Sequence, residues 1–426
     1  MIVKFKDVVQ PKDGFLRGPF GSALKKSLFV PKNDNTYKVY EQCVPLEQNE
    51  NLGKYYISEE YFKEKMYRFE ARPKDFLISC SGVNYGAIYQ LSENAEPGII
   101  NQALLRVRLN NEVIDDNYFL YLFRGLIHKK ITTGTGDSTI PNFPSMDVVK
   151  NIEFSLPDIE TQKMIGSIFF EIDKKINNND IINTTLESVV RTIYDYWFLQ
   201  FEFPNKKGNP YMSFGGEMVW NDELKRKIPK GWNVQNLIHN SLCKPIKNGL
   251  KPFELKCYLP TGNINGEDII DGDYVTPDNK ESRANMQPSK YSVWFAKMKN
   301  SIKHISIPDN SDWFIDKYIL STGMEGLQCK QDTFAYVHSL INSVFFEKQK
   351  DILAHGATQE SVNDQDLTNV KFVIPDDDTL KRYCTIINPY LEMKFSLFRQ
   401  NQELAKLRDF LLPMLMNGQV TFKEEA

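Results

Sequence analysis

Two long stretches of the chain carry hydrophobic side chains at helical spacing. The first runs from about residue 161 to 199, and the second from about residue 379 to 416. Steps of three and four residues predict one apolar stripe on each helix, and the first helix is roughly 39 residues and about 58 Å long. Pro389 lies in the first third of the second stretch, where it should kink the helix or delay its start. The stripe positions are Ile165, Ile168, Ile172, Ile176, Leu186, Val190, Ile193 and Trp197 in the first stretch, and Ile387, Leu391, Phe398, Leu404, Leu407, Leu411 and Met414 in the second.

Each helical stretch follows a copy of one short motif. Residues 151–158 read NIEFSLPD and residues 369–376 read NVKFVIPD, with Asn, Phe, Pro and Asp identical. Alternating apolar and polar positions that end at a proline predict a last strand before a boundary. The chain is therefore a tandem of two similar halves, each a globular part followed by a helix.

The two helices are expected to pack on each other. A helix of this length has too few neighbours in a small domain to bury its stripe, so a coiled coil is favoured over two ordinary core helices. The first helix carries the chain away from the first globular part and the second begins at the second, so they can meet lengthwise only if antiparallel. Asn177, Asn178, Asn179, Asn183 and Asn401 lie on or beside the stripe, where they set the register or form a solvated face.

The two globular parts predict a mixed α/β fold. Both contain short apolar or aromatic runs broken by Gly, Pro, Asn and Asp, and each has one predicted helix, at about 116–128 and 334–348. We expect a first globular domain at 1–157, a central helical spacer at 158–204, a second globular domain at 205–375, and a distal helical spacer and tail at 376–426. The two domains are expected to be alike and joined by the antiparallel helices as a pseudo-twofold tandem repeat.

Composition narrows the class of protein. The chain has 426 residues, enough for two to four domains, and 41% hydrophobic residues, enough for folded cores. It lacks an uninterrupted apolar run near 18 residues, and its first ten residues lack the apolar core of a signal peptide, so we expect a cytoplasmic protein and no membrane span. The six cysteines are scattered, which favours buried thiols over a zinc site or a redox pair.

No catalytic motif is found. The tripeptides at 209–211 and 388–390 lack the second proline of an amino-methyltransferase loop, and G-x-S-x-G and H-E-x-x-H are both missing. We therefore expect no catalytic, cofactor-binding or metal-binding residue in this chain. A self-contained DNA-cleaving or DNA-modifying enzyme with a divergent site is the alternative.

Basic clusters are the positive signal. The net charge is −3, but residues 225–256 hold eight Lys or Arg against one Glu, and residues 280–303 hold six against one. Positive loops suit phosphate contact, whereas Asn, Gln and Arg can read base edges, and a solvated loop face is the alternative for any single residue. A scaffold without a DNA role would not require this surplus. The DNA-binding candidates are Arg17, Lys25, Lys26, Lys247, Asn248, Lys251, Arg283, Lys297, Lys299 and Gln359. Lys247, Lys251, Lys297 and Lys299 are the phosphate candidates, and Arg283, Asn248 and Gln359 the base candidates.

Several segments resemble the DNA-specificity subunit of type I restriction-modification systems, and the resemblance covers nearly the whole chain. They are LPDIETQKMIGSIFFEIDKKINNN (156–179), TLESVVRTIYDYWFLQFEFP (185–204), GGEMVW (215–220), IPKGW (228–232), LAKLRDFLLPMLMNGQV (404–420) and RGPFGSAL (17–24). The second spacer departs from the family pattern, because IPDDDTLKRYC lacks the usual Gln after Leu-Pro.

The resemblance implies a division of labour. Each globular part would be a target-recognition domain that reads one half of a bipartite double-stranded DNA site, and the helices would set the unread gap. Two modification subunits would supply S-adenosylmethionine-dependent methylation, and two restriction subunits would supply ATP- and magnesium-dependent translocation and cleavage. No cofactor is then expected in this chain.

Overall fold

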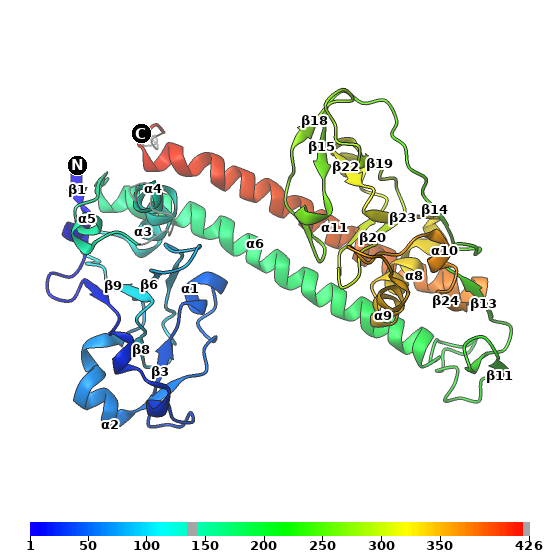
Figure 1. Cartoon of the computed structure of the whole chain (residues 1–426), viewed down its shortest axis with the longest axis horizontal. Helices are drawn as coiled ribbons and strands as arrows, with labels where there is room; N and C mark the ends of the chain where they lie inside the picture. Colours follow the sequence, from blue (N-terminus) through cyan, green and yellow to red (C-terminus); the bar gives the residue numbers. More distant parts are fainter. Residues whose placement is uncertain (134–142, 421–426) are drawn as a thin grey trace. The chain divides into compact units, whose positions relative to one another are not determined.

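The computed structural model describes residues 1–133 and 143–420, which form two compact units (Figure 1). The first unit comprises Met1–Ile176 and Glu403–Ala426, and the second comprises Asn177–Gln402. Each unit therefore contains one globular part and segments of the same two long helices. Among the described residues, no helix is long and apolar enough to cross a membrane.

The first unit is built on two four-stranded sheets and one short strand pair. One sheet has the strand order β2-β9-β6-β7 and is antiparallel, and the other has the order β4-β3-β8-β5 with β3 and β8 parallel. Strand β1 pairs with β10. The strands are β1 (Ile2–Lys4), β2 (Phe15–Arg17), β3 (Thr36–Tyr40), β4 (Tyr56–Ser58), β5 (Glu70–Ala71), β6 (Phe76–Ser79), β7 (Ile88–Gln90), β8 (Gly98–Ile100), β9 (Leu104–Val107) and β10 (Glu153–Ser155).

The second unit repeats this plan. Its sheets have the orders β14-β23-β20-β21 and β18-β15-β22-β19, with β15 and β22 parallel, and β13 pairs with β24. Two hairpins, β11–β12 and β16–β17, are additions. The strands are β11 (Met218–Asn221), β12 (Arg226–Pro229), β13 (Asn233–Asn236), β14 (Cys243–Pro245), β15 (Lys256–Leu259), β16 (Ile264–Asn265), β17 (Asp268–Ile269), β18 (Tyr274–Val275), β19 (Ala284–Met286), β20 (Ser292–Ala296), β21 (His304–Ile307), β22 (Tyr318–Ser321), β23 (Met324–Cys329) and β24 (Lys371–Ile374). The predicted α/β tandem is confirmed.

The shorter helices agree with the predictions in one unit and differ in the other. The helix predicted at 116–128 is α3, a π-helical turn over 123–127, and α4. The single helix predicted at 334–348 is wrong, because the region forms α8 and α9. Ser343 separates them, since its hydroxyl accepts a hydrogen bond from Phe346 N and caps α9. The short helices are α1 (Cys43–Glu47), α2 (Glu59–Tyr61), α3 (Asp116–Leu122), α4 (His128–Thr133), α5 (Met146–Lys150), α7 (Asp312–Lys317), α8 (Gln331–Ile341), α9 (Val344–Leu353) and α10 (Asp364–Leu367).

The two long helices are α6 (Ile159–Tyr194), followed by a π-helical turn to Leu199, and α11 (Asp377–Met416). The late start predicted from Pro389 is wrong. Helix α11 begins twelve residues before that proline, because Asp376 caps it by accepting hydrogen bonds from the backbone N and the hydroxyl of Thr379. The predicted antiparallel pairing is confirmed within each unit: Glu187 contacts Lys394 in the second, and Asp173 contacts Arg408 in the first.

The ends of both helices belong to the cores of the units. In the first unit Phe169 of α6 and Leu415 of α11 join the cluster of Phe76 and Phe119, and in the second unit Tyr194 and Tyr383 join the cluster around Tyr336. The predicted stripe is therefore buried partly by the sheets and partly by the other helix. Of the predicted packing residues, Ile165, Ile172 and Val190 are buried and Ile168, Leu186, Ile193, Leu404 and Leu411 are half-buried.

The prediction for Leu407 differs from the structure, whereas the prediction for the cysteines agrees with it. Leu407 is 46% exposed, so its assignment to the helix pair is wrong. The neighbouring Arg408 points inward instead and bonds to Asp173, which turns Leu407 toward solvent. All six cysteines are free, and five of them are buried, as the sequence predicts.

Candidate nucleic-acid interface

Several predicted DNA-binding residues of the second unit meet around the connection between β22 and β23. Thr322 N donates to Arg283 O at 2.9 Å, and Lys297 N donates to Gly323 O at 3.0 Å. Gly249 N donates to Asn285 O at 2.9 Å, which places the loop carrying Lys247, Asn248 and Lys251 beside the segment that carries Arg283. The fold therefore brings together loops that are up to about 75 residues apart in the chain.

The remaining candidates lie on the other side of Lys297. Val362 N donates to Lys297 O and Lys299 N donates to Glu360 O, both at 3.0 Å, so the segment that holds exposed Gln359 runs beside Lys299. We call this set of loops the second-unit loop surface. It comprises residues 246–251, 283–285, 297–299, 322–323 and 359–362.

The basic side chains of the second-unit loop surface differ in their ion pairing. Lys247, Lys251 and Arg283 are exposed and form no ion pair with any residue that the structure describes. Lys297 Nζ lies 3.6 Å from Glu325 Oε2, and Lys299 Nζ lies 2.8 Å from Glu360 Oε2. Burial raises the pKa of Glu325 to about 7, although the charge of Lys297 opposes that shift. Lys247 and Lys251 are therefore better suited to phosphate contact than the two paired lysines.

The basic residues at 225–256 do not form one surface. Arg226 lies in the hairpin β11–β12, where its guanidinium donates to Leu199 O at 2.8 Å and lies over the ring of Phe201. Lys230 of the segment after this hairpin pairs with Glu217 at 2.9 Å. Figure 1 draws β11 at the end of the unit far from β18. Only the later part of residues 225–256 contributes to the loop surface.

The first unit presents equivalent loops. Gly18 N donates to Leu104 O at 2.9 Å and Cys80 N donates to Ala103 O at 2.8 Å, so the loops after β2, β6 and β8 converge. Gly18 is required there, because an added Cβ would lie 1.7 Å from Asn101 O. Arg17 begins the first of these loops, with its guanidinium 5.5 Å from the ring centre of Phe143. Lys25 and Lys26 are exposed further along the same loop.

Uncharged polar residues of the first unit were not predicted from the sequence. Gln42 Nε2 donates to Ser79 Oγ at 2.8 Å, and Ser81 Oγ donates to Gln42 Oε1 at 3.0 Å. Gln102 is exposed in the loop between β8 and β9. Such groups can read base edges. Nothing local in the sequence marks them, since only the strand order brings these loops together.

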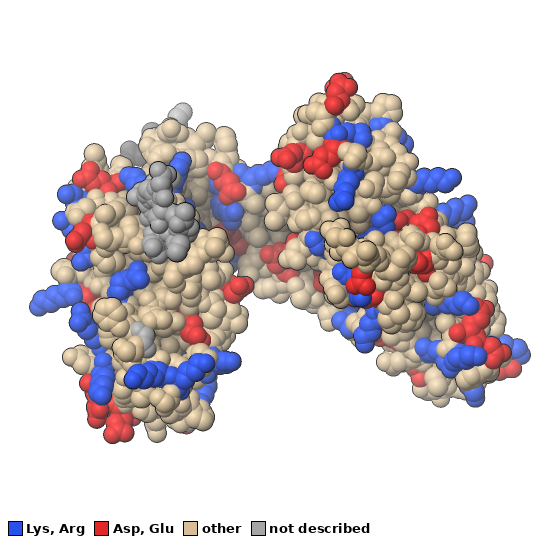
Figure 2. All heavy atoms as spheres, viewed as in Figure 1, with Lys and Arg blue, Asp and Glu red and all other residues tan. Residues whose placement is uncertain are grey.

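Basic and acidic side chains alternate on the visible surface. Figure 2 shows lysine and arginine interspersed with acidic side chains over much of the visible face of each unit. This pattern agrees with the net charge of −3. Electrostatic attraction to a phosphate backbone must therefore come from a few local cations.

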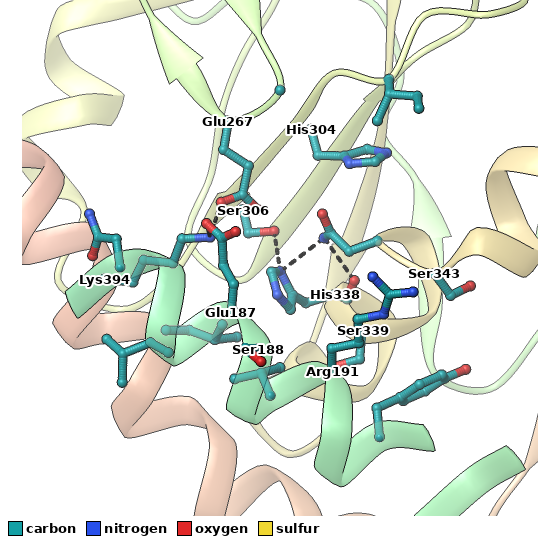
Figure 3. Close-up of a pocket in the computed structure, with 18 of the residues that line it drawn as sticks. Glu187, Ser188, Arg191, Glu267, His304, Ser306, His338, Ser339, Ser343 and Lys394 are labelled. Carbon is teal, nitrogen blue, oxygen red and sulfur yellow. Dashed lines mark hydrogen bonds and ion pairs between the residues drawn. The ribbon is translucent and has the colours of Figure 1, made fainter. Parts of the chain in front are cut away.

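A cleft of about 1240 Å³ in the second unit holds several titratable side chains (Figure 3). Lys394 bonds there to Glu187 and Glu267, whose two charges raise its pKa against the opposing effect of burial. His338 Nδ1 lies 2.6 Å from Ser306 Oγ, and burial lowers the pKa of His338 to about 4.

These contacts do not assemble a catalytic triad. The carboxylate of Glu267 is bonded to Lys394 and does not orient the imidazole of His338. Among residues 1–133 and 143–420, there is also no group of three or more His, Cys, Asp or Glu that could hold a metal ion. Lys394 instead connects the two long helices to the turn of the β16–β17 hairpin, and the contact of Ser306 with His338 connects β21 to α8.

The fold and its loops define a class of protein: two copies of one α/β domain, each with polar and basic loops at the same edge, carried on paired helices. A sequence profile for the type I restriction modification DNA specificity domain matches residues 21–188. The specificity subunit of the type I restriction enzyme MjaIX from Methanocaldococcus jannaschii is 24% identical over 383 residues, which cover 87% of this chain and 83% of the relative. The HindI specificity subunit from Haemophilus influenzae is 20% identical over 343 residues, which cover 68% of this chain and 74% of the relative.

A solved structure supports the fold. The crystal structure of a type I restriction-modification S subunit from M. genitalium superposes with a TM-score of 0.58 and 13% identity, covering 99% of this chain and 96% of that one. Over most of its length the chain is thus similar to the DNA-specificity subunits of type I restriction-modification systems. The relatives are named specificity subunits of restriction enzymes, so the comparisons favour recognition of a DNA sequence over a self-contained enzyme.

Proposed function

We propose that the chain reads a bipartite DNA site, with one half-site for each globular part and a gap set by α6 and α11. The first target-recognition domain would span 1–157 and the second 205–375, with spacers at 158–204 and 376–426. The observation that carries the proposal is the duplication itself. The same strand order delivers loops to the same sheet edge in both units, while both long helices continue from one unit into the other.

The loop surfaces are the proposed DNA contacts. In the second domain, Lys247 and Lys251 would contact phosphate, and Asn248, Arg283 and Gln359 would approach base edges. In the first domain, Lys25 and Lys26 would contact phosphate, and Arg17 would contact DNA from the start of the same loop. Because the net charge is −3 and the proposed contacts include only a few cations, binding by this chain alone should be weak and should strengthen in the assembled enzyme.

Partner subunits would complete the enzyme. Two modification subunits would supply S-adenosylmethionine-dependent methylation, and two restriction subunits would supply ATP- and magnesium-dependent translocation and cleavage, in the cytoplasm where such a complex meets DNA. Exposed apolar side chains on α6 support docking on that helix. In the second unit Ile181 is 57%, Ile182 40% and Val189 37% exposed. Such surface on a long helix is typical of a protein interface.

Exchange of one domain tests this function. Residues 205–375 are replaced by the matching region of a relative with a different target, and the methylated motif is determined by long-read sequencing of cells that also carry the modification subunit. We expect one half-site to change while the other half-site and the gap are kept. Exchange of 1–157 is the matched control and should change the opposite half-site. A change of both half-sites in either variant would contradict modular reading.

A further inference from the structure

The pairing of β20 with β23 extends further than its counterpart in the first unit. In the first unit, Gly18 N bonds to Leu104 O, which serves as the reference point on β9. The ladder between β6 and β9 ends one residue before Leu104 in the chain, where Cys80 N bonds to Ala103 O. In the second unit, Ile246 N bonds to Gly326 O, which is the equivalent point on β23. The ladder between β20 and β23 ends three residues before Gly326 in the chain, where Lys297 N bonds to Gly323 O. The second unit therefore has a two-residue extension of both strands at the edge where its loops converge.

The extension carries an ion pair that the first unit lacks among its described residues. Lys297 follows β20, and Glu325 is the second residue of β23. The Glu325 side chain is only 7% exposed and lies 3.6 Å from Lys297 Nζ, whose side chain is 26% exposed. The other charge that faces Glu325 is Asp364, at the start of α10, which further disfavours ionisation. A buried carboxylate under a surface that meets DNA is unfavourable unless it holds a cation in place.

Lys297 also has a central position. Its backbone N bonds to Gly323 O, on the side of Arg283 and Lys247, and its backbone O accepts from Val362 N, on the side of Lys299 and Gln359. Within the described part of this surface, the exposed cations without an ion pair all lie on the side of Arg283 and Lys247. Since phosphates flank a groove and base edges lie at its middle, a central cation that is already neutralised is better placed for a base than for a phosphate.

We propose that Lys297 reads a base in the half-site of the second globular part by donating to a base-edge acceptor such as guanine O6 or N7, and that Glu325 positions its ammonium group. This inference rests on the proposed function, because it assumes that the second-unit loop surface meets DNA. It assigns Lys297 to base recognition, in place of the phosphate contact expected from its charge alone. Glu325 is a positioning residue and touches no DNA.

The test compares K297M with K247M in the complex with modification subunits. For each variant the methylated motif and the salt dependence of DNA binding are measured. K297M should relax one position of the second half-site, with about a tenfold loss of preference, and leave the salt slope unchanged. K247M should lower the salt slope by about 0.9 and leave the motif unchanged. E325Q should relax the same position as K297M, to a smaller extent.

The pH dependence separates positioning from a merely structural role. Protonation of Glu325 below about pH 7 removes the partner of Lys297, so discrimination at that position should decrease from pH 8 to pH 6 in the parent protein. In E325Q, discrimination at this position should stay low and constant from pH 8 to pH 6. In E325D, which keeps a carboxylate, part of the discrimination and of its pH dependence should be restored.

Three outcomes would overturn the proposal. If K297M lowered the salt slope and left the methylated motif unchanged, Lys297 would be a phosphate contact. K297M without any effect, beside an effective K247M, would remove Lys297 from the interface while leaving the proposed function intact. If neither variant had an effect, the loop surface itself would not meet DNA.

Discussion

Asn179 of α6 and Asn401 of α11 are hydrogen-bonded across the helix pair, with Asn179 Nδ2 2.7 Å from Asn401 Oδ1. The same amide donates to Gln400 Oε1 at 2.8 Å, and Asn401 Nδ2 donates to Asp180 Oδ1 at 2.7 Å. Asn179 is fully buried, whereas Asn178 beside it is exposed. A buried polar group of this kind fixes the register of a helix pair, because a shifted register leaves it without a partner.

Removal of the Asn179 amide should therefore destabilise the second unit. We expect N179A to lower the free energy of unfolding by about 2 kcal/mol, because the acceptors on Gln400 and Asn401 lose their donor. N178A is the matched control and should change it by less than about 0.5 kcal/mol. Urea unfolding followed by circular dichroism measures both. Equal effects of the two substitutions would show that the buried amide does not hold the helices in register.

The equivalent helix caps should differ in strength. Asp158 and Asp376 each accept hydrogen bonds from the backbone N and the hydroxyl of the threonine three residues later, but Asp376 also accepts from the Trp232 indole at 2.9 Å. D158A should cost about 1 kcal/mol of stability, the usual value of a cap. D376A should cost about 2 kcal/mol, since it also leaves the indole N–H of Trp232 without its partner. The midpoints of urea unfolding of the two variants give the comparison, and a larger loss in D158A would contradict it.

Stability should fall in mild acid because of His338. Burial lowers its pKa to about 4 in the folded chain, below the value near 6.5 of an unfolded histidine. The contribution of neutral His338 to the free energy of unfolding is therefore complete above pH 6.5. As the pH falls toward 4, up to about 3 kcal/mol of that free energy is lost. Over this range we expect the unfolding free energy of the parent protein to fall relative to that of H338Q. An unchanged difference from pH 7 to pH 4.5 would mean that His338 is not held neutral.

Charge removal in the first unit should act on affinity alone. Lys25 and Lys26 are exposed in the loop after β2, so K25A and K26A should each lower the slope of log K against log salt by about 0.9 without changing the motif. K227A serves as the control, because Lys227 is an exposed lysine in the hairpin β11–β12, apart from the loop surface. A slope that falls as much in K227A would show that the effect is one of net charge.

The elements that the sequence predicts best are those with local signals. The stripe from Ile165 to Trp197 and the repeated strand before each helix are periodic within a short window, so both long helices and the tandem were predictable. The break at Ser343 and the uninterrupted helix through Pro389 were missed. In both, a single cap decides the outcome: Ser343 starts a new helix, and Asp376 starts α11 well before the proline.

The site was less predictable than the fold. Charge counts along the chain indicated Lys247 and Arg283, but they also combined the hairpin of Arg226 with a loop on a different part of the unit. They could not show that Lys297 is neutralised by Glu325, because the two are 28 residues apart and meet only through the pairing of β20 with β23. Gln42 and Ser81 carry no charge and were not detected.

The role of the helices as a ruler is the central claim, and matched insertions test it most directly. Four residues are added to α6 beside Asn179 and four to α11 beside Asn401, so that the contacts on either side of the insertions keep their partners. The helices lengthen by about 6 Å, and the helical segments beyond the insertions rotate by only about 40°. A two-residue pair of insertions is the control, since it turns the apolar stripes by about 200° and should abolish activity.

The measurement is the methylated motif of each variant in cells with the modification subunit. We expect the four-residue variant to recognise the same two half-sites across a gap that is one or two base pairs longer, since base pairs are stacked about 3.4 Å apart. An active four-residue variant with an unchanged gap would contradict the ruler role of α6 and α11.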